Sequence, residues 1–133
     1  MHQTKKNKIA VIFAVLALAV AVFLVFKLSA DSHSGKKISE DIVFFFKDGC
    51  PYCQTEEQFL DDLLKDYPQT KIKRLNVSED NNVEVLERLY QAYEVPSDSW
   101  GYVPVTFLKQ KYLIGFDDSA KQEIKNYIEN LSK

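Results

Sequence analysis

A long apolar run near the start of the chain sets the first limit on what can fold. Residues 9–26 are eighteen consecutive apolar residues without a charge. At about 1.5 Å of rise per residue, a helix of this length spans roughly 27 Å, close to the thickness of one hydrocarbon core. The 104 residues after Ser29, in a chain of 133, suffice for one modest domain. The sequence therefore predicts a transmembrane helix over residues 9–28, acting as a signal anchor, and one folded domain after it.

The lysines around this run predict its orientation. Lys5, Lys6 and Lys8 precede it, and positively charged flanks stay on the cytoplasmic side of a membrane. We therefore expect residues 1–8 to be a cytoplasmic basic tail and the folded domain to lie outside, in a periplasm or at the cell surface. A signal peptide cleaved after Ala30 is the alternative, although the run exceeds the usual ~7–15 residues of a signal core.

The composition after the run excludes several classes of function. From residue 30 onward, thirteen Lys and Arg stand against nineteen Asp and Glu, a net charge of −6. Because nucleic-acid binding needs a basic surface, we expect no nucleic-acid partner. The chain has two cysteines, Cys50 and Cys53, which excludes a multi-disulfide scaffold and a four-cysteine zinc site, and we expect no bound metal. The short polar stretch 29–40 is expected to be a linker.

The remaining residues, 41–133, show the pattern of an α/β domain. Five consecutive apolar residues at 42–46 fit a central strand that is buried on both faces. The other expected elements, in order, are a helix from the cysteines to Pro68, a strand near 72–77, a helix from about residue 80 to Pro96, strands at 105–108 and 112–116, and a last helix ending near Leu131. Asp80 or Asn81 is expected to cap the second helix, and Asp118 or Ser119 the third.

This order, β-α-β-α-β-β-α, restricts the topology. The first half is a βαβ unit, which requires a parallel pair of strands, and the second half closes the sheet with an antiparallel hairpin. We therefore expect a four-stranded mixed sheet with helices on both faces.

The two cysteines form a C-x-x-C pair that opens a helix directly after a buried strand. One helical turn brings the sulfurs of Cys50 and Cys53 within bonding distance, and the free N–H groups and dipole of a helix N-terminus favour a thiolate. Pro51 suits the first helical position. We expect Cys50 to be the exposed nucleophile and Cys53 the shielded resolving thiol. A structural disulfide and a metal chaperone holding a soft cation between the thiolates remain alternatives.

The Cys50-Pro51-Tyr52-Cys53 motif after a strand, with a later Val-Pro pair before a hairpin, resembles the thioredoxin-fold superfamily. The resemblance covers residues 38–131, and its central Pro-Tyr is of the glutaredoxin type. It implies a thioredoxin-like fold and, at Pro104, a cis peptide bond that faces the dithiol. The residues that the resemblance assigns to substrate binding are Pro51, Tyr52, Val103 and Pro104.

Two further parts of the sequence were compared with that superfamily: one resembles it in part, and the other departs from it. Residues 113–118 resemble the glutaredoxin segment that meets glutathione, which implies a possible contact of a thiol peptide with Gly115, Asp117 and Asp118. The adjacent glycine pair of glutaredoxins is reduced to Gly115 alone, which argues against glutathione as a partner. The buried acid that thioredoxins carry six residues before the first cysteine is Phe44 here, so the usual proton acceptor for the resolving thiol is absent.

The sequence thus predicts a membrane-anchored, extracytoplasmic thiol–disulfide oxidoreductase. Its own dithiol is the expected redox cofactor, with no other cofactor required. The expected partners are exported protein thiols and disulfides, together with a membrane or extracytoplasmic protein that recharges the dithiol. The direction of electron flow is open. The competing hypothesis is a non-enzymatic binding or assembly module with a structural disulfide.

Overall fold

A computed structural model of the chain describes residues 14–20 and 38–133. The chain divides into two units, Met1–Ser34 and Gly35–Lys133. In the first unit the structure describes residues 14–20, which are helical; most of the expected span at 9–28, the basic tail and most of the linker lie outside the described residues. No helix within the described ranges is long and apolar enough to cross a membrane.

A four-stranded mixed sheet in the order β2-β1-β3-β4 forms the centre of the second unit. Its strands are β1 (Ile42–Phe46), β2 (Ile72–Asn76), β3 (Val105–Leu108) and β4 (Tyr112–Ile114). Strand β1 pairs in parallel with β2 and antiparallel with β3, which pairs antiparallel with β4. The predicted parallel pair and closing hairpin are confirmed, and the topology is that of the thioredoxin-like fold.

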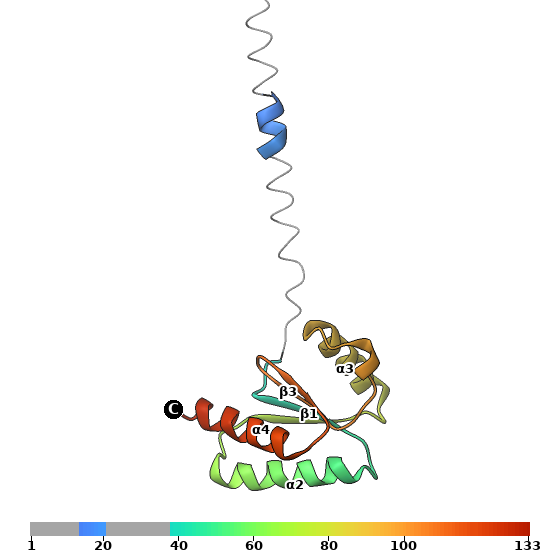
Figure 1. The fold of residues 1–133 in the computed structure, drawn as a ribbon, viewed down its shortest axis with the longest axis vertical. Coiled ribbons are helices and arrows are strands. Elements are labelled where there is room, and N and C mark those ends of the chain that lie inside the picture. The colour runs from blue at the N-terminus through green and yellow to red at the C-terminus, as the bar shows by residue number, and fades with distance from the viewer. Residues whose placement is uncertain (1–13, 21–37) are drawn as a thin grey trace, which may run out of the picture. The chain divides into compact units, whose positions relative to one another are not determined.

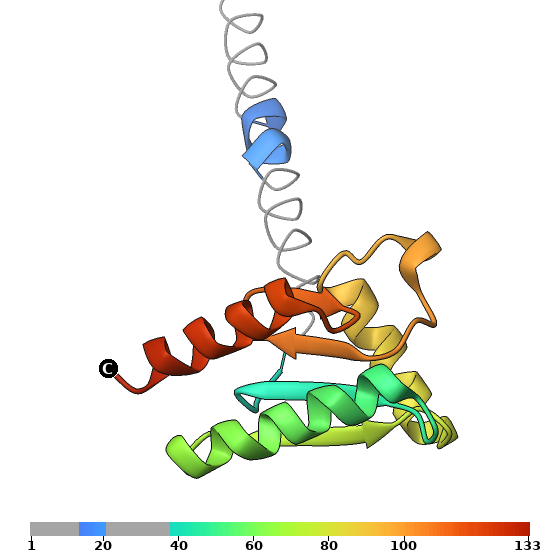
Figure 2. The same ribbon diagram turned by 60° about the horizontal axis from the view of Figure 1, so that its bottom comes forward.

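Helices cover both faces of this sheet, as Figures 1 and 2 show. Helices α2 (Pro51–Asp66) and α4 (Asp118–Leu131) lie on one face, and α3 (Asp80–Ala92) lies on the other. Because successive side chains of a strand point to opposite faces, Phe44 packs beneath α2 and α4 while Phe45 packs beneath α3. Strand β1 is therefore central and buried on both faces, as predicted.

The helix caps differ from the prediction. The N-cap of α3 is Glu79, without a side-chain cap bond, and Asp80 already lies within the helix. The N-cap of α4 is Asp117, whose Oδ1 accepts the Ala120 N–H at 2.8 Å. An N-cap residue has extended backbone while the next residue is already helical, and Asp117 is the residue that meets this condition. The predicted caps at Asp80 or Asn81 and at Asp118 or Ser119 are therefore wrong.

Strand β4 ends two residues earlier than predicted, at Ile114 instead of Phe116. Gly115 has a φ of 78°, a left-handed conformation that a strand cannot continue and that glycine adopts without a steric cost. Its N–H donates to the carbonyl oxygen of Pro104 at 2.8 Å. The end of the hairpin is thereby joined to the residue that precedes β3.

The loop between α3 and β3 contains a short 3₁₀ helix, η1 (Ser97–Ser99), that the sequence pattern did not predict. Trp100 anchors this loop. Its indole N–H donates to the Val95 carbonyl oxygen at 3.0 Å, and its ring stacks on Tyr90 with centroids 5.0 Å apart. The stretch from Trp100 to Pro104 therefore starts from a fixed point on the core beneath α3.

Candidate active site

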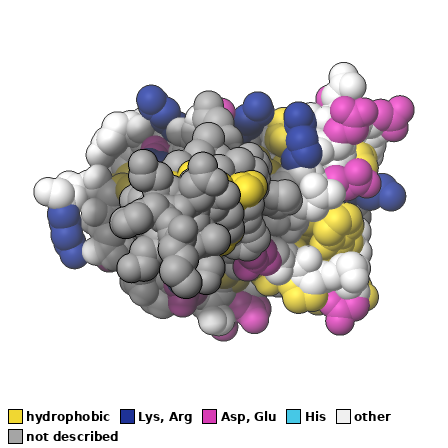
Figure 3. Space-filling model, turned by 90° about the horizontal axis from the view of Figure 1, so that it is seen from above, with side chains coloured by type: hydrophobic (Ala, Val, Ile, Leu, Met, Phe, Trp, Pro, Cys, Tyr) yellow, Lys and Arg dark blue, Asp and Glu magenta, His cyan; other side chains and the backbone are white. Residues whose placement is uncertain are grey.

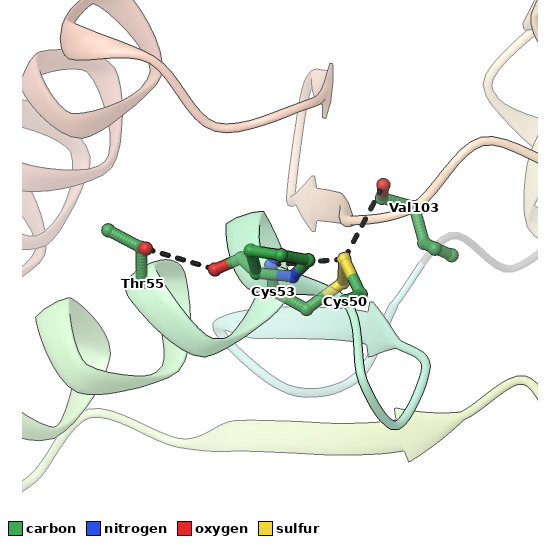
Figure 4. Close-up of a disulfide and its surroundings, with 5 residues drawn as sticks. Cys50, Cys53, Thr55 and Val103 are labelled. Carbon is green, nitrogen blue, oxygen red and sulfur yellow. Dashed lines mark hydrogen bonds between the residues drawn. A yellow bond between two sulfur atoms is a disulfide. The ribbon is translucent and has the colours of Figure 1, made fainter.

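The cysteine pair lies where the chain leaves β1 and enters α2. Cys50 is the N-cap of α2 in extended backbone, and Pro51 follows in the first turn, where its missing N–H leaves no helical hydrogen bond unmade. Cys50 and Cys53 form a disulfide with their Cα atoms 5.2 Å apart (Figure 4). The strand–turn–helix junction therefore places both sulfurs at the N-terminal end of α2.

The two sulfurs differ in their access to solvent. Cys50 is half-buried, whereas Cys53 is 2% exposed. The backbone N–H of Cys53 donates to the Cys50 sulfur at 3.2 Å. This N–H group and the dipole of α2 favour negative charge on Cys50 once the disulfide is reduced. The geometry thus makes Cys50 the sulfur that a partner can reach and the one best able to carry a thiolate.

The peptide bond between Val103 and Pro104 is cis, as the resemblance implied. The Val103 carbonyl oxygen lies 4.0 Å from the Cys50 sulfur (Figure 4). A disulfide sulfur has no proton to donate, so this approach is a contact in the oxidised form, and a reduced Cys50 thiol has a carbonyl acceptor within reach. The cis-proline loop therefore faces the dithiol.

The residues expected to bind substrate surround the disulfide with mixed exposure. Tyr52 is 66% exposed, Pro51 is exposed, Val103 is half-buried and Pro104 is buried. Tyr102, which the sequence analysis did not single out, is 62% exposed and directly precedes Val103. One exposed aromatic ring thus lies between the two cysteines in the sequence, and another directly precedes the residue whose carbonyl oxygen approaches Cys50.

The three residues expected to meet a thiol peptide lie between the end of β4 and the first turn of α4. Gly115 lies beside the cis-proline loop through its bond to Pro104. The Asp117 carboxylate is engaged in capping α4, and the Asp118 carboxylate is fully exposed and pairs with Lys121 at 3.2 Å. Gly115 is thus hydrogen-bonded to the loop that faces the dithiol, and the contact of a thiol peptide with these three residues stays a prediction.

A buried carboxyl group that the sequence analysis missed lies one turn beyond Cys53. Glu56 is 1% exposed, and its Oε1 accepts a hydrogen bond from the Thr106 hydroxyl on β3. Burial raises the pKa of Glu56 to about 7, while the Thr106 hydrogen bond acts in the opposite direction. The sequence offered one signal, the helical spacing of positions 53, 56, 60 and 63, and the structure buries all four of these residues.

Within the described residues, no group of three or more His, Cys, Asp and Glu side chains is arranged to hold a metal ion. The chemistry that the described groups offer is that of a dithiol, a nearby backbone carbonyl and a buried carboxyl group.

Comparison with known proteins adds one relative. Over 76 residues the chain is 36% identical to a protein of Brevibacillus choshinensis described as a disulfide bond formation protein. The match covers 57% of this chain and 61% of that protein, so the chain spans less than two thirds of its relative. No protein-family model matches.

Solved structures similar to the chain include two glutaredoxins. Glutaredoxin grx-1 of Archaeoglobus fulgidus is 16% identical with a TM-score of 0.46, and the match covers 68% of this chain and 87% of that one. Wheat glutaredoxin is 20% identical with a TM-score of 0.47, covering 68% of this chain and 77% of that one. At these scores the fold assignment rests on the strand order and pairing described above.

Proposed function

We propose that this chain is a thiol–disulfide oxidoreductase that works through Cys50 and Cys53. The observation that carries the proposal is the disulfide at the N-terminus of α2, in which Cys50 is half-buried and its sulfur lies 4.0 Å from the Val103 carbonyl oxygen. A structural disulfide requires neither an accessible sulfur nor a facing cis-proline loop. The relative named for disulfide bond formation supports the same class of activity.

The reaction follows from the unequal access to the two sulfurs. When the dithiol is reduced, the Cys50 thiolate attacks a partner disulfide, forms a mixed disulfide and releases one partner thiolate. Cys53 then attacks the Cys50 sulfur, restores the internal disulfide and releases the second partner thiolate. When the chain is oxidised, a partner thiolate attacks Cys50 and the same steps run in reverse. The dithiol is the redox cofactor in both directions.

The surface around Cys50 is suited to a polypeptide partner. The exposed rings of Tyr52 and Tyr102 offer apolar contact area, and the Val103 carbonyl beside Pro104 offers a backbone hydrogen-bond acceptor for an extended segment. The proposed partners are exported protein thiols and disulfides and a membrane or extracytoplasmic protein that recharges the dithiol. The described side chains on the face in Figure 3 carry both signs of charge, which does not favour nucleic acid as a partner.

The proposed location is the outer side of a membrane, with residues 9–28 as a single anchor. The uncharged apolar run and the lysines before it support this proposal. Such a tether would keep the dithiol domain close to exported chains as they emerge.

Trapping of mixed disulfides tests the proposed function. In Cys53→Ser the resolving sulfur is missing, so we expect covalent adducts with partner proteins that dissolve on reduction. In Cys50→Ser the accessible sulfur is missing and Cys53 is buried, so we expect no adducts. Non-reducing gel electrophoresis followed by mass spectrometry measures both. Adducts from neither variant would identify the bond as structural, and adducts from Cys50→Ser alone would reverse the two roles.

A further inference from the structure

We infer that Asn76 is a positioning residue for Cys50, because its side chain fixes the turn that leads from β1 into α2. This role rests on the proposed function and adds to it a residue from another strand. The turn runs from Lys47 to Cys50, and the Cys50 N–H closes it by donating to the Lys47 carbonyl oxygen at 3.3 Å. Its third residue, Gly49, has a φ of 76°, at the position where a type II turn requires a positive φ. The conformation of this turn therefore sets the backbone position of Cys50.

Few contacts hold this turn in place. Lys47, Asp48 and Gly49 are exposed, and a Cβ atom added at Gly49 would meet no atom beyond its chain neighbours within 4 Å. Among the described residues, the side chains of these three make one hydrogen bond, in which Asn76 Nδ2 donates to Asp48 Oδ2 at 2.9 Å. Because a segment with little packing opens easily, this bond has a large share in keeping the turn in one conformation.

Asn76 is itself held by a regular element. It is the last residue of β2 and lies opposite Phe46 in the parallel pair of β1 and β2. The pairing continues beyond it, since the Val77 N–H donates to the Phe46 carbonyl oxygen at 2.9 Å. The amide oxygen of Asn76 accepts the Ser78 N–H at 2.9 Å, which leaves the amide nitrogen to donate to Asp48. The side chain of Asn76 thus joins the end of β2 to the turn.

The same bond decides where the negative charge of Asp48 lies. Strands β2 and β3 flank β1 on opposite sides in the sheet. Asp48 is tied to the end of β2, whereas the Cys50 sulfur approaches Val103, two residues before β3. A carboxylate close to a thiolate disfavours it. The bond to Asn76 therefore keeps the charge on the side of the turn opposite the loop that the Cys50 sulfur approaches.

Other titratable groups also lie around Cys50. Lys47 belongs to the turn, Tyr52 and Glu56 to α2, and Tyr102 directly precedes the residue that the sulfur approaches. The two acids at the start of α4 are engaged in a cap and in an ion pair. All of these groups are the same in every variant of the test below, so differences between the variants come from the substituted residues.

Alkylation of the reduced full chain by iodoacetamide tests this role, because its rate follows the thiolate fraction of Cys50. Mass spectrometry confirms that the label is on Cys50, and rates across a pH series give the inflection at which this thiol ionises. In Asn76→Ala the bond is lost and the charge of Asp48 is kept. We expect the inflection to move to higher pH and the rate below it to fall by about threefold. In Asp48→Asn the charge is lost and the bond is kept, because an amide oxygen accepts it equally, so we expect an inflection at or below the wild-type pH.

Matched variants separate this bond from other effects of substitution. Asp48→Ala removes both the bond and the charge, so it should react more slowly than Asp48→Asn. Adding Asn76→Ala to Asp48→Ala should change nothing further, because the coupled partner is already absent. Asn82→Ala removes a different hydrogen bond at the same strand end, from Asn82 Nδ2 to the Asn76 carbonyl oxygen at 2.9 Å, and should leave the inflection in place.

Several outcomes would overturn the inference. A wild-type inflection in Asn76→Ala is one, and an equal shift in Asn76→Ala and Asn82→Ala is another, because it would assign the effect to the strand end as a whole. If Asn76→Ala does not fold, equal rates for Asp48→Ala and Asp48→Asn, both at an exposed position, overturn it as well. The measurement needs no partner protein, so failure of Cys53→Ser to trap partners would count against the proposed function alone.

Discussion

The burial of Glu56 ties the stability of the folded domain to pH. The pKa of Glu56 is about 7 in the folded chain against an ordinary value of 4.5. Because the folded state favours the protonated form, this stabilisation is fully present below about pH 4.5 and is lost as the pH rises through 7. Over that window we expect the free energy of unfolding to fall by roughly 3 kcal/mol from this group.

Urea unfolding at a series of pH values measures this dependence. The free energy of unfolding of Glu56→Gln should depend less on pH, because its amide cannot ionise. The difference between the variant and the wild-type chain should therefore favour the variant more at pH 8 than at pH 5. Glu57→Gln should retain the wild-type decline. An unchanged decline in Glu56→Gln would show that another group is responsible.

Sequence reasoning found some of the site residues and missed others for a physical reason. Cys50 and Cys53 were predictable because they are close in the sequence, and one helical turn is enough to bring their sulfurs together. Pro104 was predictable because cis peptide bonds are almost confined to proline. Glu56 was missed because a glutamate in an amphipathic helix ordinarily faces solvent. Its partner, Thr106, lies fifty residues away in the sequence, and no local pattern connects them.

At the level of elements, the centres were more predictable than the ends. Strands β1 and β3 begin and end as predicted, because all but one of their residues are buried and that burial determines where they lie. The caps and the end of β4 depend on the backbone conformation of single residues, such as the extended backbone of Asp117 and the left-handed conformation of Gly115. Several polar residues near each helix start can serve as a cap, so composition alone does not select one.

The C-terminal end of α3 tests whether the backbone conformation of a single residue affects the stability of a helix end. Val95 N–H donates to the Tyr90 carbonyl oxygen at 2.8 Å and Glu94 N–H to that of Gln91 at 3.2 Å, the hydrogen-bond pattern of a Schellman motif. Glu94 occupies its left-handed position with a φ of 54°, where glycine is usual. We expect Glu94→Gly to raise the free energy of unfolding by up to about 1 kcal/mol, because the Cβ atom is removed from a strained conformation.

Chemical denaturation of Glu94→Gly and Glu94→Ala distinguishes this effect from a charge effect. Glu94→Ala also removes the carboxylate but keeps the Cβ atom, so it should give little or no stabilisation. Equal stabilisation by both variants would attribute the gain to the lost charge. Destabilisation by the glycine variant would mean that its greater freedom in the unfolded chain outweighs the relieved strain.

For the whole molecule, the order of elements determined the topology of the dithiol domain. A βαβ unit followed by a hairpin leaves few ways to form one sheet, and the chain adopts the mixed arrangement β2-β1-β3-β4. The placement of this domain relative to a membrane follows from different physics, the apolar run and its flanking lysines. That part of the prediction concerns residues that mostly lie outside the described ranges, and the test must come from the intact chain in cells.

Labelling of the dithiol in intact cells tests the proposed location. After mild reduction the half-buried Cys50 is accessible to a maleimide, whereas Cys53 is 2% exposed, so we expect predominantly one label per chain. With a membrane-impermeant maleimide, an extracytoplasmic domain should be labelled before lysis to nearly the extent reached after lysis. Cys50→Ser should lose most of the label under both conditions, which identifies the modified residue. Label that appears only after lysis would place the dithiol on the cytoplasmic side and reverse the orientation drawn from Lys5, Lys6 and Lys8.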